Sequence, residues 1–421
     1  MRLKSFLLSD KNIDTNSFLW NMIGSMLMAF QSVIMLMILT RVLGLVDAGI
    51  FTIAFANANL FLNIGKYGMR NFQVSDVKKQ FSFADYKISR IITVIAMLLT
   101  SVGYTLYTAY ENDYSAEKTQ IIIWMCLFKI VDAAEDIYHG YYQQENRLDI
   151  ASKCLALRMF STILVFSFGL IFFKNQLIAL IISTILTAFL FLIFTKWTIG
   201  EFHSPSVKYN KKNVRLLLKL CFPLFAGAFL SFYIGNAPKY AIDATLSDEL
   251  QACYGFIAMP VFVIGLLNSF IFNPMLYKMT QLWDSGKVKK FVAQTILQSG
   301  IVFVITIICI GGAYLLGIPV LSWLYNTDLS PYKTELIILL LGGGFLGFSG
   351  LLNAFITIIR CQKWIMWGYV LIAILAFIFS NPIVEMYGML GASVLYTALM
   401  GGLCIIFVLL FIYGILKYKN K

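Results

Sequence analysis

Residues 119–140 read TQIIIWMCLFKIVDAAEDIYHG, an apolar stretch with five ionisable side chains: Lys129, Asp132, Glu135, Asp136 and His139. At about 100° per residue in an α-helix, four of them fall within a sector roughly 80° wide, and Glu135 lies beside it. A charge at the centre of a bilayer costs about 2.5–3.5 kcal/mol or more, so such residues face a watery cavity or a partner helix. The stretch therefore predicts either the lining of a transport pathway or ion pairs that join helices.

The composition is that of a polytopic all-α membrane protein. Of the 421 residues, 59% are hydrophobic and 13% charged, whereas about 25% of the residues of soluble proteins are charged. Apolar runs of about 17–25 residues indicate membrane-spanning helices. Twelve such runs are present, at residues 18–40, 48–64, 91–107, 119–138, 155–173, 177–194, 220–235, 254–272, 292–315, 336–359, 364–380 and 389–416.

The longest segment between predicted spans, residues 196–219, separates six spans from six. We predict an N-terminal six-helix lobe over residues 1–200 and a C-terminal six-helix lobe over residues 201–421. In both halves a polar hinge leads through glycine and an aromatic residue into a span, at residues 41–51 and 244–256. Six helices per repeat keep their orientation, so the repeat axis is expected along the membrane normal.

The positively charged residues are concentrated in the loops on one side of the membrane. The chain carries a formal charge of +12, and most of its Lys and Arg residues fall on one side of the membrane if the N-terminus is cytoplasmic. This bias predicts that both termini are cytoplasmic. It also accounts for the basic composition without a nucleic-acid partner.

Signatures of enzymatic chemistry are missing from the sequence. It has no GxxxxGK[ST] phosphate loop, no HExxH and no GxSxG motif. Its seven cysteines lie in or beside predicted spans without a CxxC pair. We expect a protein that is not an enzyme and that has no metal and no organic cofactor.

Cations in or beside the spans are the candidates for binding an anionic group, because Arg and Lys are strong partners of phosphate. Lys129 is the best of them, since it lies about ten residues from either end of its span and cannot easily reach water. Arg70 and Arg158 have an alternative to binding an anionic group: their long side chains can extend to the cytoplasmic interface of the membrane. Amides in the spans, Gln31 among them, can bind sugar hydroxyls or form hydrogen bonds between helices, and we prefer the second interpretation for most of them. The remaining candidates are the cations Arg41 and Lys239, and for ion coupling or charge balance Asp132, Glu135, Asp136 and Asp243.

Four motifs indicate a known family: TRVLGLVDAGIF at residues 40–51, YGMRNFQVSD at 67–76, GYYQQENRLD at 140–149 and NAPKYAID at 236–243. With these motifs in this order and twelve predicted spans, essentially the whole chain resembles the Wzx-type polysaccharide flippases of the multidrug/oligosaccharidyl-lipid/polysaccharide exporter superfamily. One departure is Val46-Asp47-Ala48, which replaces the more usual Pro-Glu-Xaa-Tyr type of turn before Gly49. We therefore infer nothing about the structure or role of this turn from the family.

The resemblance implies two six-helix lobes around a central cavity. It implies that the protein flips an undecaprenyl-diphosphate-linked oligosaccharide repeat unit, of capsule or O-antigen type, across the bacterial cytoplasmic membrane. Transport is expected by alternating access without ATP hydrolysis, driven by a proton or sodium gradient or by substrate flux. The expected form is a functional monomer in contact with membrane lipids, with a polysaccharide polymerase and glycosyltransferases as candidate partners. In this hypothesis Lys129 holds the pyrophosphate, and the other cavity or gate cations are Arg41, Arg70, Arg158 and Lys239.

Three other functions stay open. A small-molecule drug exporter of the same superfamily predicts an acidic cavity for cationic compounds, whereas this chain has both signs of charge. A membrane polysaccharide polymerase predicts a long external loop, which the sequence lacks. The third alternative is an assembly subunit that does not itself transport.

Overall fold

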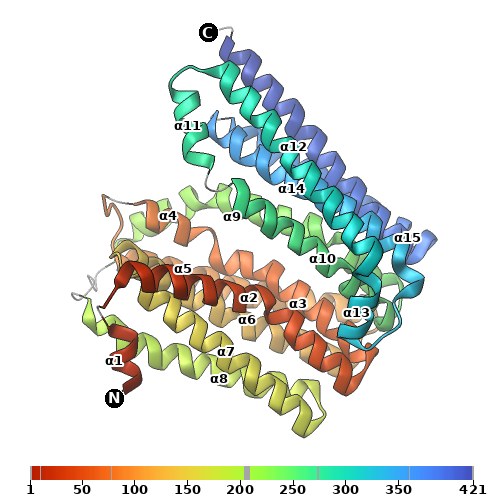
Figure 1. Cartoon of the computed structure of the whole chain (residues 1–421). Helices are drawn as coiled ribbons and strands as arrows, with labels where there is room; N and C mark the ends of the chain where they lie inside the picture. Colours follow the sequence, from red (N-terminus) through yellow and green to blue (C-terminus); the bar gives the residue numbers. More distant parts are fainter. Residues whose placement is uncertain are drawn as a thin grey trace. The chain divides into compact units, whose positions relative to one another are not determined.

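The computed structural model describes residues 2–9, 11–76, 78–202, 209–272, 275–359 and 361–419. Over these residues the chain consists of helices and connecting turns (Figure 1). It divides into two compact units, unit 1 (Met1–Phe229) and unit 2 (Leu230–Lys421). The boundary lies inside helix α9, Lys211–Thr245, which begins in unit 1 and ends in unit 2.

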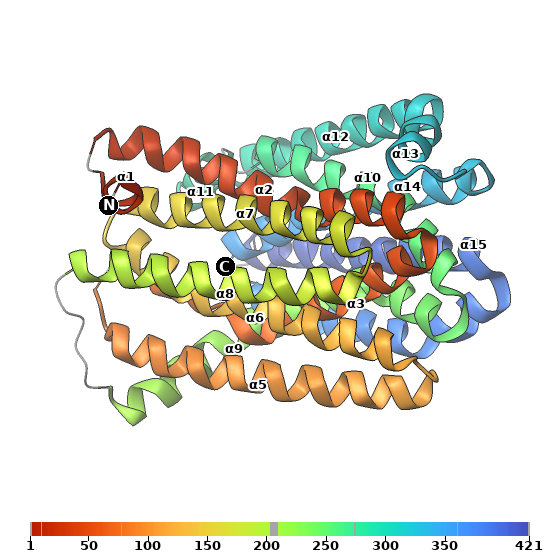
Figure 2. The same ribbon diagram turned by 90° about the horizontal axis from the view of Figure 1, so that it is seen from below.

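Unit 1 holds, in chain order, α1 (Arg2–Leu8), α2 (Ile13–Leu43), α3 (Leu45–Lys66), α4 (Met69–Ser75), α5 (Phe83–Glu111), α6 (Ala116–Gln144), α7 (Leu148–Phe173), α8 (Gln176–Thr198), the 3₁₀ turn Ile199–Glu201 and the first part of α9. Its long helices run roughly side by side (Figure 2). Helix α3 is the most buried of its candidate spans, and α6 packs against α3, α5, α7 and α8. The charged stretch therefore lies at the centre of unit 1.

Unit 2 holds the rest of α9, α10 (Asp248–Phe272), α11 (Leu276–Asp284), α12 (Val288–Gly312), the π-helical turn Ala313–Gly317, α13 (Ile318–Tyr325), the 3₁₀ turn Ser330–Tyr332, α14 (Lys333–Ile358) and α15 (Gln362–Lys419). Helices α12 and α15 lie beside α14 (Figure 1). A Cβ atom on Gly344 would lie 2.4 Å from Thr306 Cγ2, and one on Gly347 would lie 2.1 Å from Asn268 Nδ2. These two glycines thus allow α12 and α10 to approach α14 closely.

The predicted spans agree with the helices in most places. Nine helical segments of the described residues are long and apolar enough to cross a membrane. The charged helix α6 is not one of the nine, although it has 29 residues. Helix α15 is interrupted at Gly388 (φ 57°, ψ −137°), where the sequence predicts a break between two spans. The all-α membrane fold is confirmed, and the count of twelve spans stays a prediction.

The prediction for residues 220–235 was wrong in extent. A helix over residues 220–235 would have Pro223 in its first turn and Pro238 after its end, but both prolines lie within α9. A proline removes one backbone hydrogen bond, and membrane helices tolerate this loss where neighbouring groups satisfy the freed carbonyl. Lys239 and Asp243 consequently lie in the last turns of a helix and not in a loop.

Candidate functional site

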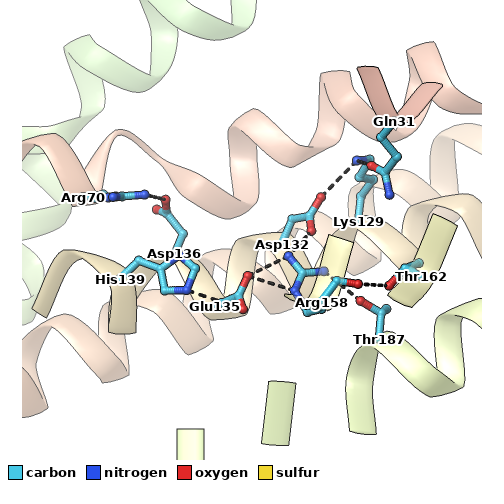
Figure 3. A network of polar contacts seen from close by, with 10 residues as sticks. All are labelled: Gln31, Arg70, Lys129, Asp132, Glu135, Asp136, His139, Arg158, Thr162 and Thr187. Carbon is cyan, nitrogen blue, oxygen red and sulfur yellow. Dashed lines mark hydrogen bonds and ion pairs between the residues drawn. The ribbon is translucent and has the colours of Figure 1, made fainter. Parts of the chain in front are cut away.

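The five ionisable residues of the opening stretch lie buried along one side of α6. Ser115 precedes the helix as its N-cap, and its hydroxyl accepts a hydrogen bond from the Lys118 backbone amide at 3.1 Å. From there, spacings of three and four residues align the charged side chains along the helix (Figure 3). The prediction that they share a face is confirmed.

Lys129 is held by protein groups. Its Nζ lies 3.0 Å from Asp132 Oδ2 and 3.0 Å from Gln31 Oε1 on α2. The same ammonium lies 4.8 Å from the centre of the Phe55 ring, a cation–π distance. Lys129 is therefore a paired, desolvated cation that joins α6 to α2 and α3.

Arg158 on α7 forms the densest part of the network (Figure 3). Its guanidinium donates to Asp132 Oδ1 at 2.7 Å, to Glu135 Oε2 at 2.6 Å and to the Thr187 hydroxyl at 2.7 Å. The side chain is 1% exposed. The alternative in which Arg158 reaches the cytoplasmic interface was wrong, because α7 begins at Leu148 and so places Arg158 near the middle of the helix.

Asp136 lies between two arginines. Arg90 of α5 is 3% exposed and binds Asp136 Oδ2 at 2.8 Å, and it also donates to the Gly65 carbonyl. Arg70 of α4 is 29% exposed, and its Nη1 lies 3.9 Å from Asp136 Oδ1. Arg90 thus satisfies the carboxylate, whereas the contact with Arg70 is long and partly open to solvent.

Two neighbouring hollows adjoin this network. The first has a volume of about 90 Å³ and is lined by Lys66 and Arg70 together with charged residues of the network. The second, of about 450 Å³, shares Asn21, Lys66, Arg70 and Asp136 with the first. Lys129 is not among the residues that line these hollows. Lys66 makes no ion pair with any residue that the structure describes.

A tight reversal brings Lys66 and Arg70 to the same hollow. Helix α3 ends at Lys66, and Tyr67 (φ 51°) and Gly68 (φ 66°) both adopt the left-handed conformation before α4 starts. Glycine adopts this conformation without strain. Arg70 is then oriented by Gln143 of α6, whose Oε1 accepts from Arg70 Nη2 at 3.0 Å.

The loop after α4 is fastened to the end of α6 as well. Lys79 Nζ lies 2.5 Å from Glu145 Oε1, and this hydrogen bond raises the pKa of Lys79 above its ordinary value. The Lys79 side chain is 58% exposed and the Glu145 side chain 29%, so the contribution of the pair to stability is small. The contact joins the segment after α4 to the end of α6.

The structure brings together six of the predicted residues: Lys129, Arg70, Arg158, Asp132, Glu135 and Asp136. Arg41 is exposed near the end of α2 and outside this network, and Lys239 and Asp243 belong to unit 2. Sequence analysis did not single out Lys66, Arg90 or Thr187, and it assigned Gln31 to helix packing. Lys66 and Arg90 lie just outside the apolar runs 48–64 and 91–107, where hydropathy alone assigns a cation to a connecting loop.

Gly140 couples α6 to α4, and Gly140→Val is expected to lower the melting temperature of the detergent-solubilised protein. A Cβ atom there would lie 2.4 Å from Gln73 Oε1 and 3.3 Å from Arg70 Cγ. Gln73 is fully buried, so overpacking of about 1–3 kcal/mol should displace α4. The matched control is Gly103→Val on α5, where a Cβ atom meets nothing within 4 Å. Equal melting temperatures of the two variants would contradict this coupling.

Comparison with known families gives a match over most of the chain. Residues 15–280 match the model of a family described as polysaccharide biosynthesis protein. No curated protein sequence matches the chain significantly.

Solved structures share the fold at low sequence identity. An inward-facing multidrug resistance MATE family transporter of the MOP superfamily aligns with a TM-score of 0.69 and 11% identity, covering 96% of this chain and 98% of that one. A MOP superfamily transporter from Pyrococcus furiosus, described as having a binding pocket of reverse polarity, aligns with a TM-score of 0.61 and 14% identity, covering 100% and 98%. The chain thus belongs to the polysaccharide biosynthesis protein family and has the fold of the MOP superfamily transporters.

Proposed function

We propose that this protein flips an undecaprenyl-diphosphate-linked oligosaccharide, of capsule or O-antigen type, across the bacterial cytoplasmic membrane, and that Lys66 and Arg70 bind its pyrophosphate. The observation that carries the proposal is a surplus of positive charge beside a hollow. The second hollow is lined by two cations, Lys66 and Arg70, and by one carboxylate, Asp136, which Arg90 already binds at 2.8 Å. Membership in a polysaccharide biosynthesis family supports a glycan cargo.

Lys66 and Arg70 suit an anion better than the buried cations do. Lys129, Arg158 and Arg90 already contact carboxylates at 3.0 Å or less. Arg70 can leave Asp136 without exposing an unpaired charge, because Arg90 stays on that carboxylate at 2.8 Å. An Arg fork and a Lys point charge together match the geometry of a pyrophosphate.

The second hollow suits the sugars next to the pyrophosphate. Its volume of about 450 Å³ lies in the range of small-molecule sites, about 300–1,000 Å³. Asn21, Asn71 and Gln143 line it and offer amide donors and acceptors for hydroxyl groups. In this proposal the polyprenyl chain stays in the lipid.

The buried network then has the task of charge balance. Asp132 pairs with both Lys129 and Arg158, and Glu135 pairs with Arg158 and lies 3.4 Å from His139 Nε2. Such paired groups can also bind or release a coupling proton or sodium ion as the hollow changes its access. Asp243 of unit 2 is the remaining candidate for this role.

The remaining parts of the proposal follow the charge bias and the family resemblance. Both termini are placed in the cytoplasm, and α4 and the hollows face the cytoplasmic side. Two lobes, residues 1–200 and 201–421, alternate access around a central cavity in a functional monomer. The substrate comes from glycosyltransferases and passes to a polysaccharide polymerase.

Reconstituted transport tests the proposal. Purified protein in liposomes is expected to move a fluorescent undecaprenyl-diphosphate oligosaccharide between leaflets, measured as the lipid-linked sugar that an externally added glycosidase can cleave. Cationic dye efflux is measured in parallel. Dye efflux without movement of the glycolipid would favour the drug exporter, and longer glycan chains without movement would favour the polymerase. Inactivity in both assays, with the protein folded, would favour the assembly subunit.

A further inference from the structure

The first turns of α9 carry four cations on one exposed face. Lys211, Lys212, Arg215 and Lys219 are all exposed and fall within a sector about 100° wide. Residues 211–229 contain no Asp or Glu. None of the four side chains pairs with a carboxylate in the part of the chain that the structure describes. This basic face therefore lacks a protein counter-charge among the described residues.

The opposite face of α9 is fixed to unit 1. Leu217 and Cys221 are fully buried in a cluster with Met69, Phe81, Tyr86 and Ile137. Asp85, near the start of α5, accepts from the Asn210 amide at 2.7 Å and from Asn213 Nδ2 at 3.2 Å. These contacts set the rotation of α9 about its own axis. The four cations consequently stay on the outside of unit 1.

Apolar side chains adjoin the basic face. Leu216 is 47% exposed and Leu220 is 44% exposed, and both lie on the flank next to the cations. Phe222, 50% exposed, continues the basic face itself, one turn beyond Lys219 and two turns beyond Arg215. Along α9 the surface thus changes from cationic to apolar as the helix enters the membrane. A phospholipid has the same order, from a charged head group to acyl chains.

We propose that this face of α9 is a binding site for anionic phospholipid. The four cations contact the phosphate and anionic head group, and Leu216, Leu220 and Phe222 contact the acyl chains. Basic residues at a membrane surface each strengthen binding to anionic lipid by several-fold. Lipid fits better than a nucleic acid, because exposed leucine and phenylalanine beside the charges offer nothing to a phosphate backbone, whereas they match acyl chains next to a charged head group. The proposal does not rest on the proposed transport function, since Lys66 and Arg70 are not part of this face.

Native mass spectrometry of the full chain tests the site. Protein in a neutral detergent is titrated with dioleoylphosphatidylglycerol or with dioleoylphosphatidylcholine, and the bound fraction gives an apparent Kd for each lipid. We expect the wild type to bind the anionic lipid at least tenfold more tightly than the zwitterionic one. The variant K211Q/K212Q/R215Q/K219Q should lose this preference.

The matched control removes the same charge elsewhere. K278Q/K287Q/K289Q/K290Q neutralises four exposed cations of unit 2 and should keep the preference. The variant K211R/K212R/K219R, which retains the charge, should also keep it. Free glycerol phosphate at the same concentration should not displace the lipid, since it lacks acyl chains. The proposal is overturned if the wild type binds both lipids equally, if the two quadruple variants lose the preference equally, or if glycerol phosphate displaces the lipid.

Discussion

Arg158→Met is expected to destabilise unit 1 by about 3–5 kcal/mol, the usual cost of removing one partner from a buried ion pair. Arg158 is the one group that contacts both Asp132 and Glu135 in the described part of the chain. Without it, Glu135 keeps only the 3.4 Å contact with His139, in a site where its side chain is 5% exposed. Methionine fills a similar volume, so the loss is chiefly one of charge.

Lys129→Met provides the internal comparison. It also removes a buried cation, but Asp132 keeps Arg158 at 2.7 Å and the loss should be smaller. The double variant R158M/E135Q should recover much of the stability, because it removes the uncompensated carboxylate together with the cation. Melting curves of the detergent-solubilised variants measure all three. Phe160→Ala, at a position on α7 that is 53% exposed, is the control for a change that leaves the network intact. If Arg158→Met has the same melting temperature as Phe160→Ala, the network does not stabilise unit 1.

Much of the fold could be predicted from the sequence, because length and hydropathy determine which segments cross a membrane. The shared face of Lys129, Asp132 and Asp136 also followed from helical periodicity alone. The residues that pair with them could not be predicted in this way, because Arg90, Arg158 and Gln31 come from three other helices. No local sequence pattern indicates contacts between helices. From the sequence, candidate anion-binding cations can be ordered only by how far they lie from the ends of a predicted span. This order gives no sign that the deepest cation, Lys129, is neutralised while Lys66 at a helix end faces the hollow.

The double variant K66Q/R70Q is expected to reduce movement of the lipid-linked oligosaccharide at least tenfold in the reconstituted assay. A hydrogen bond to a charged group contributes about 1.5–3 kcal/mol, so two lost contacts to pyrophosphate correspond to tenfold or more in affinity. The melting temperature should change little. Both side chains are partly exposed, and Asp136 keeps its 2.8 Å contact with Arg90.

Charge and position must be separated in this experiment. K278Q/K290Q removes two exposed cations from unit 2 and should transport like the wild type. K66R/R70K keeps both charges and should retain more activity than K66Q/R70Q. Inorganic pyrophosphate should compete with the glycolipid in the wild type and in the charge-retaining variant, but only weakly in K66Q/R70Q. If K66Q/R70Q transports normally while folded Lys129→Met does not, the pyrophosphate is held by the buried lysine. The cations at the hollow would then serve only to set the topology of the chain.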